Sequence, residues 1–364
     1  MTLANYHSHI HVLYIKKEVV AKAKKVMSLT RIAKVLNSGG KVVFLTGAGT
    51  SVSAGIPDFR SPGGMYDTLK PELLTASTNE RMAMAQDPTT VVSWSLFSQN
   101  QFPYLELRRP FILGIADKKW KPTATHIFMR LCHDKGLLKH VLTQNIDGLD
   151  YQTGIPPEKV ISVHGSMGQI NCEGCGTEMD PIEFNQAVKT NIKDLYGVDS
   201  NAPSKSSHIL CNQCQKPLVK PNTVLYGRSL PPAFFSAVEE DFPQGGGNVN
   251  WNGEDILFVV GTSLTVQPAA SVPLRATASL RVLVDLNDVG GGMFDFSENE
   301  VIDNVHQIRK SPSRDIFLQG KCDVMFVNLA AECGWLEEMA SLSEMMSDAS
   351  RVLVANKLKE MQDK

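Results

Sequence analysis

Short runs of apolar, often β-branched residues recur along the chain and are separated by longer stretches of mixed apolar and polar residues. The runs lie at residues 41–46, 141–143, 256–260 and 282–284. Apolar runs of this length, without polar alternation, are typical of strands that are buried on both faces of a parallel sheet. Residues 126–135, between two of the runs, mix apolar and polar positions as a helix does. The pattern therefore predicts an α/β fold with a parallel sheet.

Several stretches depart from this pattern. The first 28 residues are rich in lysine and helical in composition, and residues 243–253 are so rich in Gly and Asn that we expect a flexible insertion. From residue 325 onward the composition is again helical, with a break expected at Gly334. We therefore expect an N-terminal extension (1–28), a main domain (29–340, made of 29–167 and 223–340 with a module at about 168–222 inserted) and a C-terminal helical tail (341–364).

Four of the seven cysteines form two pairs with the same spacing, Cys172-x-x-Cys175 and Cys211-x-x-Cys214. Paired cysteines of this kind are typical of metal ligands, and four thiolates make the closed tetrahedral set of a structural zinc site. Such a site has no open position for water, so the metal is not expected to be catalytic. The alternative is a coincidence of buried cysteines, which the doubled spacing disfavours.

A glycine-rich segment, residues 47–60, follows the first predicted strand. Glycines at this place let the backbone approach a pyrophosphate, and a helix that starts after them offers free N–H groups. The ordinary dinucleotide fingerprint needs glycine at position 52, where this chain has Val52, and the lysine of a P-loop is absent. ATP hydrolysis is therefore disfavoured, and the two glycines alone would equally suit a tight turn.

The longer segment resembles the signature of the sirtuin family, Gly-Ala-Gly-x-Ser-x-x-x-Gly-Ile-Pro-Asp-Phe-Arg, and matches it at every fixed position. The resemblance covers about residues 30–340 and is greatest to the class I branch, which contains cytosolic and mitochondrial animal deacetylases. The other matching motifs are residues 121–123, 143–149, 164–166, 219–222, 261–264 and 286–287, together with both cysteine pairs. The resemblance implies a Rossmann-like parallel sheet with helices on both faces, plus a small zinc-binding module.

The resemblance also implies an activity: removal of acetyl groups from the lysines of histone or non-histone proteins. NAD would be the co-substrate, the acetyl group would pass to ADP-ribose, and nicotinamide and O-acetyl-ADP-ribose would be released. A long-chain deacylase or a mono-ADP-ribosyltransferase could use the same pocket. A dehydrogenase is disfavoured by the broken fingerprint, and a non-catalytic NAD-binding protein by the intact His164, Asn145 and Asp147.

Roles for individual residues follow from the resemblance. His164 would act as the general base that helps to deprotonate a ribose hydroxyl, and Asn145 would also be catalytic. Val224, Tyr226 and Gly227 would accept the acyl-lysine segment, which would add as a strand. The NAD-binding residues would be Gly47, Ala48, Gly49, Thr50, Ser51, Ile56, Asp58, Phe59, Arg60, Gln144, Asn145, Ile146, Asp147, Gly261, Thr262, Ser263, Asn287 and Cys322.

The chain departs from the family at one substrate position, where Phe-Gly-Glu is usual and this chain has Tyr226-Gly227-Arg228. Either the Arg228 side chain faces the substrate and favours acidic neighbours of the acetyl-lysine, or it points to solvent or to a nearby acid. Relatives that remove succinyl or malonyl groups carry a Tyr and an Arg after the phosphate motif. Residues 61–69 hold no Arg, which favours acetyl or longer apolar acyl groups.

Composition adds little to this interpretation. With 43% hydrophobic and 20% charged residues and a net charge of −2, the chain has the profile of an ordinary globular protein. This charge gives no general attraction to nucleic acid or to anionic membranes. No apolar run approaches the ~18 residues of a spanning helix. We expect an intracellular protein of the cytoplasm or nucleus; the lysines of residues 1–28 are a solvated helical face or, alternatively, a mitochondrial targeting segment.

Overall fold

The computed structural model describes most of the chain. The described residues are 25–57, 64–243, 255–276, 280–296, 299–302, 308–311 and 313–363. Residues 1–24 of the predicted extension and 244–253 of the predicted insertion lie outside them.

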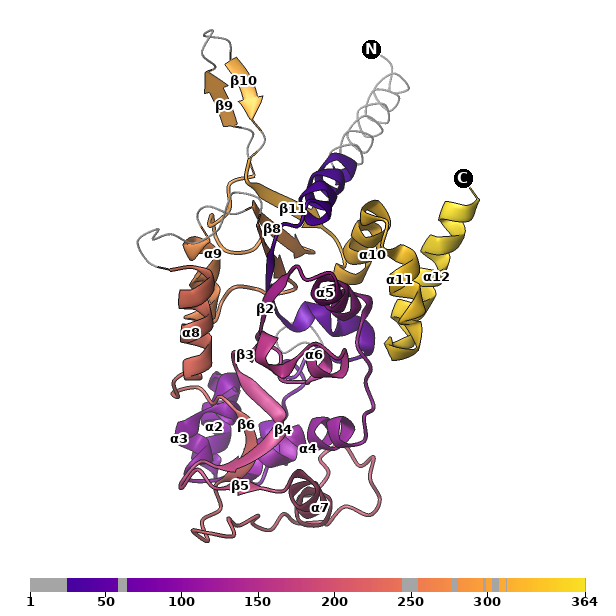
Figure 1. Ribbon diagram of the computed structural model, residues 1–364. Helices are drawn as coiled ribbons and strands as arrows, with labels where there is room; N and C mark the ends of the chain where they lie inside the picture. The colour runs from indigo at the N-terminus through magenta and orange to yellow at the C-terminus, as the bar shows by residue number, and fades with distance from the viewer. Residues whose placement is uncertain are drawn as a thin grey trace, which may run out of the picture.

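A six-stranded parallel sheet forms the centre of the larger part of the molecule (Figure 1). In spatial order its strands are β11 (Asp315–Gln319), β8 (Leu280–Asp285), β7 (Ile256–Val260), β1 (Val42–Thr46), β2 (Leu138–Thr143) and β3 (Val160–Ser162). All neighbouring strands pair in parallel. Every residue of β1 and β7 is buried, which explains why both read as unbroken apolar runs. The predicted parallel sheet is confirmed, and the edge strands β3 and β11 complete it.

Helices cover both faces of this sheet. One face is packed by a helix at residues 25–37, α5 (Ala124–Asp134), α10 (Cys322–Cys333), α11 (Leu336–Ser341) and α12 (Asp348–Gln362), and the other by α8 (Pro232–Asp241) and α9 (Val272–Arg275). Aromatic rings fill the first interface: Phe44 stacks on Phe258 and Phe128 packs against Phe326, each with ring centroids 4.9 Å apart. Gly334, in the left-handed conformation at φ +77°, ends α10 as the sequence predicts.

A smaller part of the molecule has its own hydrophobic core and lies below the sheet in Figure 1. It contains α2 (Thr78–Gln86), α3 (Trp94–Phe97), α4 (Phe102–Ala116), α7 (Pro181–Asn191) and an antiparallel sheet in the order β5 (Glu178–Met179), β4 (Gly165–Cys172) and β6 (Val219–Thr223). Leu105 of α4 and Phe184 of α7 are fully buried in this core. The smaller part therefore draws on two separate stretches of chain, of which the cysteine-bearing segment is only one.

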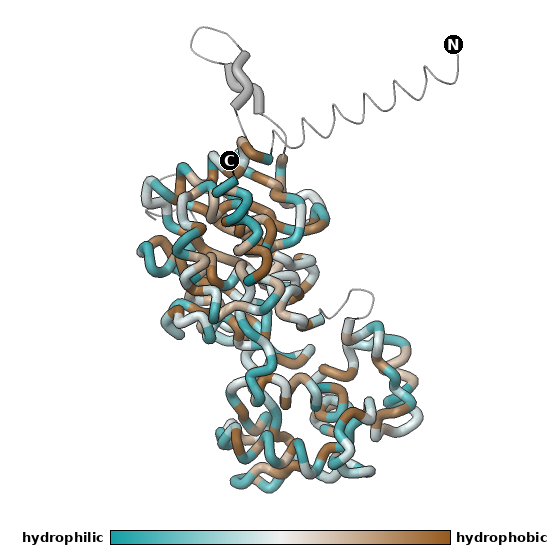
Figure 2. The backbone as a smooth tube through the Cα atoms, turned by 90° about the vertical axis from the view of Figure 1, so that its right-hand side faces the viewer, coloured by the Kyte–Doolittle hydropathy of each residue, from teal (hydrophilic) through white to brown (hydrophobic). Residues whose placement is uncertain are grey.

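The remaining elements are short. They are 3₁₀ turns at Ala48–Thr50 and Val52–Ala54 after β1, the helix α6 (Leu149–Gln152), and the antiparallel strands β9 (Asn299–Ile302) and β10 (Ile308–Ser311). Apolar segments run through the inside of both parts (Figure 2). Within the described part of the chain, no helix combines the length and the apolar character needed to cross a bilayer.

The topology of the large sheet determines where a ligand can bind. The chain passes from the central strand β1 to β2 on one side and later returns to β7 on the other. In open α/β sheets ligands bind outside the carboxyl ends of the strands, at the point where the strand order reverses. The loops that follow β1, β2, β7 and β8 are therefore expected to border the functional site.

Candidate NAD and substrate site

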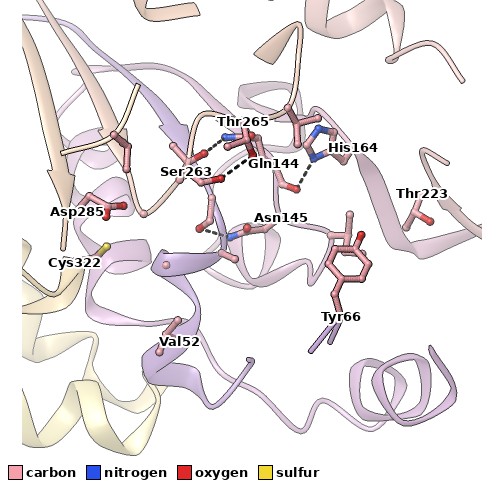
Figure 3. Close-up of a pocket in the computed structure, with 18 of the residues that line it drawn as sticks. Val52, Tyr66, Gln144, Asn145, His164, Thr223, Ser263, Thr265, Asp285 and Cys322 are labelled. Atoms are coloured by element: carbon pink, nitrogen blue, oxygen red, sulfur yellow. Dashed lines mark hydrogen bonds between the residues drawn. The ribbon is translucent and has the colours of Figure 1, made fainter. Parts of the chain in front are cut away.

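A cavity of about 1080 Å³ opens at the carboxyl ends of these strands. It is lined by the loops after β1, β2, β7 and β8, by the segment after β6, and by the start of α10. Figure 3 shows side chains from these separate segments facing a common space, with His164 and Tyr66 toward one end and Asp285 and Cys322 toward the other. A cavity of this size is large enough for a ligand with several chemical groups.

Two glycine-rich loops touch each other in the middle of the cavity wall. The Gly49 N–H donates to the Gly261 carbonyl at 2.9 Å, and a Cβ on Gly49 would lie 2.6 Å from the Gly261 Cα. Gly261 itself has φ +57°, in the region that glycine adopts most easily. Gly49 and Gly261 therefore need to be glycine for the close approach of the two loops, and the residues at 47–49 and Gly261 all line the cavity.

Two amide side chains at the end of β2 hold these loops in place. The Asn145 Nδ2 group donates to the Gly47 carbonyl at 3.0 Å and to the Thr50 hydroxyl at 2.9 Å, while Gln144 Nε2 donates to the Thr262 hydroxyl at 2.9 Å. Asn145 is only 6% exposed, yet both amides line the cavity. The loop after β2 is thereby tied to the loops that follow β1 and β7.

His164 stands immediately before β4, on the cavity wall. Its Nδ1 lies 3.0 Å from the Gln144 carbonyl oxygen, which can only accept, so Nδ1 carries the proton. Its Nε2 is buried and makes no hydrogen bond with any residue in the described ranges. Burial lowers the pKa of His164, an effect that the Gln144 carbonyl opposes. The imidazole is therefore neutral near pH 7, with a lone pair on Nε2.

Four predicted NAD-binding residues lie behind the cavity wall rather than among the described residues that line it: Thr50, Ser51, Ile56 and Asp147. The Ser51 hydroxyl donates to Asp147 Oδ2 at 2.7 Å, and the Leu149 N–H donates to the other oxygen. Burial raises the pKa of Asp147. These residues brace the loop from behind, and their contact with a ligand stays a prediction. The predicted residues Asp58, Phe59 and Arg60 lie outside the described part of the chain.

The far end of the cavity contains Asn287 and Cys322, both predicted, and Asp285, which sequence reasoning missed. Asp285 ends strand β8, and its Oδ1 accepts the Asn287 N–H at 3.0 Å. Burial raises the pKa of this carboxyl group. The position of Asp285 in the sequence could have identified it, because a carboxylate at the carboxyl end of a parallel strand is suited to bind ribose hydroxyls. Ile146, Thr262 and Ser263 also line the cavity, as predicted.

The segment after β6 forms the wall next to His164. The Val224 N–H donates to the His164 carbonyl at 2.8 Å, and both backbone groups of Tyr226 pair with residues 92–94. Val224, Tyr226 and Gly227 all line the cavity. The guanidinium of Arg228 lies 3.2 Å from Glu173 and 3.8 Å above the Trp94 ring, which favours the alternative that this side chain points to a neighbouring acid.

Among the lining residues that belong to no motif are Tyr66, Tyr104 and Arg108. Tyr104 and Arg108 come from α4, and the Tyr104 hydroxyl lies 2.8 Å from that of Thr223. Arg108 is 6% exposed, with its guanidinium carbon 5.7 Å from the centre of the Tyr104 ring. The lack of Arg at residues 61–69 therefore does not leave the cavity without a cation.

The four paired cysteines meet in the smaller part of the molecule. Their sulfur atoms all lie within 4.8 Å of one another, with Cys172 to Cys214 and Cys175 to Cys211 each at 3.6 Å. Four thiolates around zinc, each at a Zn–S distance of about 2.3 Å, are separated by about 3.8 Å in a tetrahedron. The cluster thus fits a structural zinc ion, as the spacing predicts.

Comparisons with known proteins agree with this geometry. The model of the family described as "Sir2 family" matches residues 47–268. The "NAD-dependent protein deacetylase hst2" of Schizosaccharomyces pombe is 32% identical over 330 residues, which cover 90% of this chain and 82% of that protein. The "NAD-dependent protein deacetylase sirtuin-2" of Danio rerio is 31% identical, covering 89% of this chain and 77% of that protein.

A solved structure supports the fold. A chain from a structure described as "Structural Basis for the Mechanism and Regulation of Sir2 Enzymes" superimposes with a TM-score of 0.59. The superposition covers 85% of this chain and 98% of the other, at 24% sequence identity.

Proposed function

The chain belongs to the Sir2 family, and on this premise we propose that it is an NAD-dependent protein deacetylase that acts on acetylated lysines of proteins. The observation that carries the mechanism is the fixed tautomer of His164. The Gln144 carbonyl, 3.0 Å from Nδ1, keeps the proton on that nitrogen, and the buried Nε2 retains its lone pair. A neutral imidazole on the wall of a cavity is suited to take a proton from a bound hydroxyl.

NAD, when bound, supplies the ADP-ribosyl group that receives the acetyl group as nicotinamide leaves. The backbone of residues 47–49 and of Gly261, which line the cavity, would lie against its pyrophosphate. Gln144 and Asn145 would orient the ribose next to His164, and Asp285 and Asn287 would bind hydroxyls at the other end. Nε2 of His164 would then accept the proton of a ribose hydroxyl.

The protein substrate would enter along the segment that follows β6. Val224 lies on the cavity wall between β6 and the turn at Gly227 (φ +88°), so an acyl-lysine segment could pair with the backbone there as an added strand. Val224 is held next to His164 in the wall, because its N–H donates to the His164 backbone carbonyl at 2.8 Å. Zinc at the four cysteines would stabilise the smaller part and take no part in the reaction.

Incubation of the whole chain with NAD and an acetyl-lysine peptide tests this proposal. Mass spectrometry should detect nicotinamide, deacetylated peptide and O-acetyl-ADP-ribose in equal amounts. His164→Ala should keep less than a tenth of the turnover, because general-base catalysis contributes ~10²–10⁴-fold. His133→Ala is a matched control, since His133 lies on α5 outside the cavity lining. Nicotinamide released without deacetylated peptide would instead indicate ADP-ribosyl transfer or NAD hydrolysis.

A further inference from the structure

The cavity wall beside His164 includes residues 224–228, all of which line the cavity. Backbone hydrogen bonds hold the first part of this wall segment: Val224 is bonded to His164, and Tyr226 is bonded to residues 92–94. The first part of the wall segment is therefore fixed to two other segments of the chain, one of which carries the proposed general base.

The end of the wall segment is held by a side chain, that of Arg228. After the turn at Gly227 (φ +88°), the Arg228 N–H donates to the Leu225 carbonyl at 3.0 Å, which belongs to the same segment. The Arg228 guanidinium lies 3.2 Å from Glu173 Oε2, and its carbon lies 3.8 Å from the centre of the Trp94 ring. An ion pair and a cation–π contact thus act together on one partly exposed side chain. Both contacts are made with residues outside the wall segment.

Glu173, the acid that Arg228 meets, stands between two of the four clustered cysteines, Cys172 and Cys175. Its Oε1 lies 2.8 Å from the Nζ of Lys220, which is 1% exposed, and its N–H donates to the Leu218 carbonyl at 2.9 Å. The carboxylate is therefore fixed from the side of the buried lysine and from its own backbone. The zinc-binding loop thus presents a carboxylate in a set position to the end of the wall segment.

We propose that Arg228 is a positioning residue for the peptide substrate, which acts by fastening the wall segment to the zinc-binding loop through Glu173. The proposal rests on the proposed function, since it assumes that the peptide pairs with this wall. The apparent affinity for peptide falls with the fraction of molecules in which the wall is in place. Arg228 acts through Glu173 and Trp94 and not through the peptide, so it supports acidic and basic peptides equally. The zinc-binding loop thereby influences affinity for peptide and leaves affinity for NAD unchanged.

Fluorescence anisotropy of labelled acetyl-lysine peptides with the whole chain tests the contact without relying on turnover. Arg228→Ala should raise the dissociation constant about three- to fivefold, the effect of losing an ion pair and a ring contact at a partly exposed site. Glu173→Gln should have a similar effect, because the amide oxygen can still accept from Lys220 while the amide NH₂ faces Arg228. The double variant should bind no more weakly than either single variant. The KM for peptide should rise in parallel, whereas kcat, the KM for NAD and affinity for ADP-ribose should not change.

Arg275→Ala is the matched control, because Arg275 also pairs with an acid, Glu239 at 2.6 Å, but does not line the cavity. It should bind peptide as wild type does.

Three results would overturn the proposal: wild-type peptide affinity in Arg228→Ala, additive losses in the double variant, or a loss confined to peptides with Asp or Glu beside the acetyl-lysine. The last result would show that Arg228 touches the substrate itself. Wild type that binds peptide without deacetylating it would refute the proposed function alone, and the anisotropy comparison would still decide this proposal. If wild type binds no acetyl-lysine peptide, both proposals fail.

Discussion

Replacement of Asp323 should destabilise the part of the molecule in which α10 and α12 pack beside the cavity. Its Oδ1 accepts the Thr125 N–H at 3.0 Å and the Thr125 hydroxyl at 2.6 Å. Its Oδ2 accepts the hydroxyls of Ser53 and Ser350 at 2.7 and 2.6 Å. Thr125 and Ser350 are fully buried, so water cannot replace the lost acceptor. One carboxylate thus joins α5, α10, α12 and the turn after the phosphate loop.

Two substitutions of Asp323, by alanine and by asparagine, should lower the unfolding free energy by different amounts. In Asp323→Ala, the Thr125 N–H and at least one hydroxyl lose their acceptor inside the protein, at about 2 kcal/mol each, or about 4 kcal/mol of unfolding free energy. In Asp323→Asn, the remaining oxygen can still accept from Thr125, and the hydroxyl of Ser53 can rotate to accept from the new amide. The Ser350 oxygen already accepts from the Ala124 N–H and the Ser347 hydroxyl, so the Ser350 O–H loses its acceptor. We therefore expect a loss of about 2 kcal/mol for the asparagine variant, half of that for alanine.

Guanidinium denaturation of wild type and both variants measures these losses, with ADP-ribose titration as a second readout. Asp348→Ala, which removes an exposed carboxylate at the start of α12, should cost less than about 1 kcal/mol. The alanine variant should also bind ADP-ribose more weakly, because α12 loses its anchor. If the alanine and asparagine variants lose equal stability, or if the alanine variant loses less than about 1 kcal/mol, the carboxylate does not have the role described.

The remaining predictions concern catalysis, zinc and the glycine loops. Burial lowers the pKa of His164, and the neutral imidazole is the base. The plot of kcat against pH should therefore be flat above pH 6.5, the ordinary pKa of histidine, and fall only at lower pH. A fall in kcat with its midpoint above pH 6.5 would contradict this. Purified protein should contain about one zinc per chain, which Cys211→Ser should lose and Cys132→Ser should keep; metal-free active protein would exclude the zinc site. Gly261→Ala should lower NAD affinity, because its Cβ would lie 2.7 Å from the Gly49 Cα. Gly136→Ala is the control: Gly136 has φ +69° but open space around it, so the variant should lose only ~1–2 kcal/mol of unfolding free energy through backbone strain.

The sequence predicts the central sheet well because its strands are buried on both faces. All residues of β7 and all but Thr46 of β1 are apolar, so each strand leaves an apolar run in the sequence. The edge strand β3 has only three residues, of which one is fully buried, and leaves no such run. The zinc cluster was equally readable, since the ligands of each pair must stand three residues apart.

Residues that reach the site through tertiary packing alone could not be predicted. Arg108 and Leu353 lie in ordinary amphipathic surroundings, and only the packing of α4 and α12 brings them to the cavity. Asn145 itself belongs to a motif, but its bond to the Gly47 carbonyl spans 98 positions of the chain and could not be predicted. Side chains of this kind leave no local pattern, so their place in the site depends on the whole fold.

Cys322 has a chemical consequence that its position in the cavity wall would not suggest. Burial raises the pKa of its thiol to about 12, and the negative charges of Asp323 and Asp285 contribute in the same direction. Only the thiolate reacts readily with alkylating reagents or peroxides. At neutral pH this sulfur therefore stays protonated and inert, so mild oxidative stress should leave the nucleotide cavity intact. A covalent inhibitor aimed at this cysteine would consequently need a warhead that does not depend on thiolate formation.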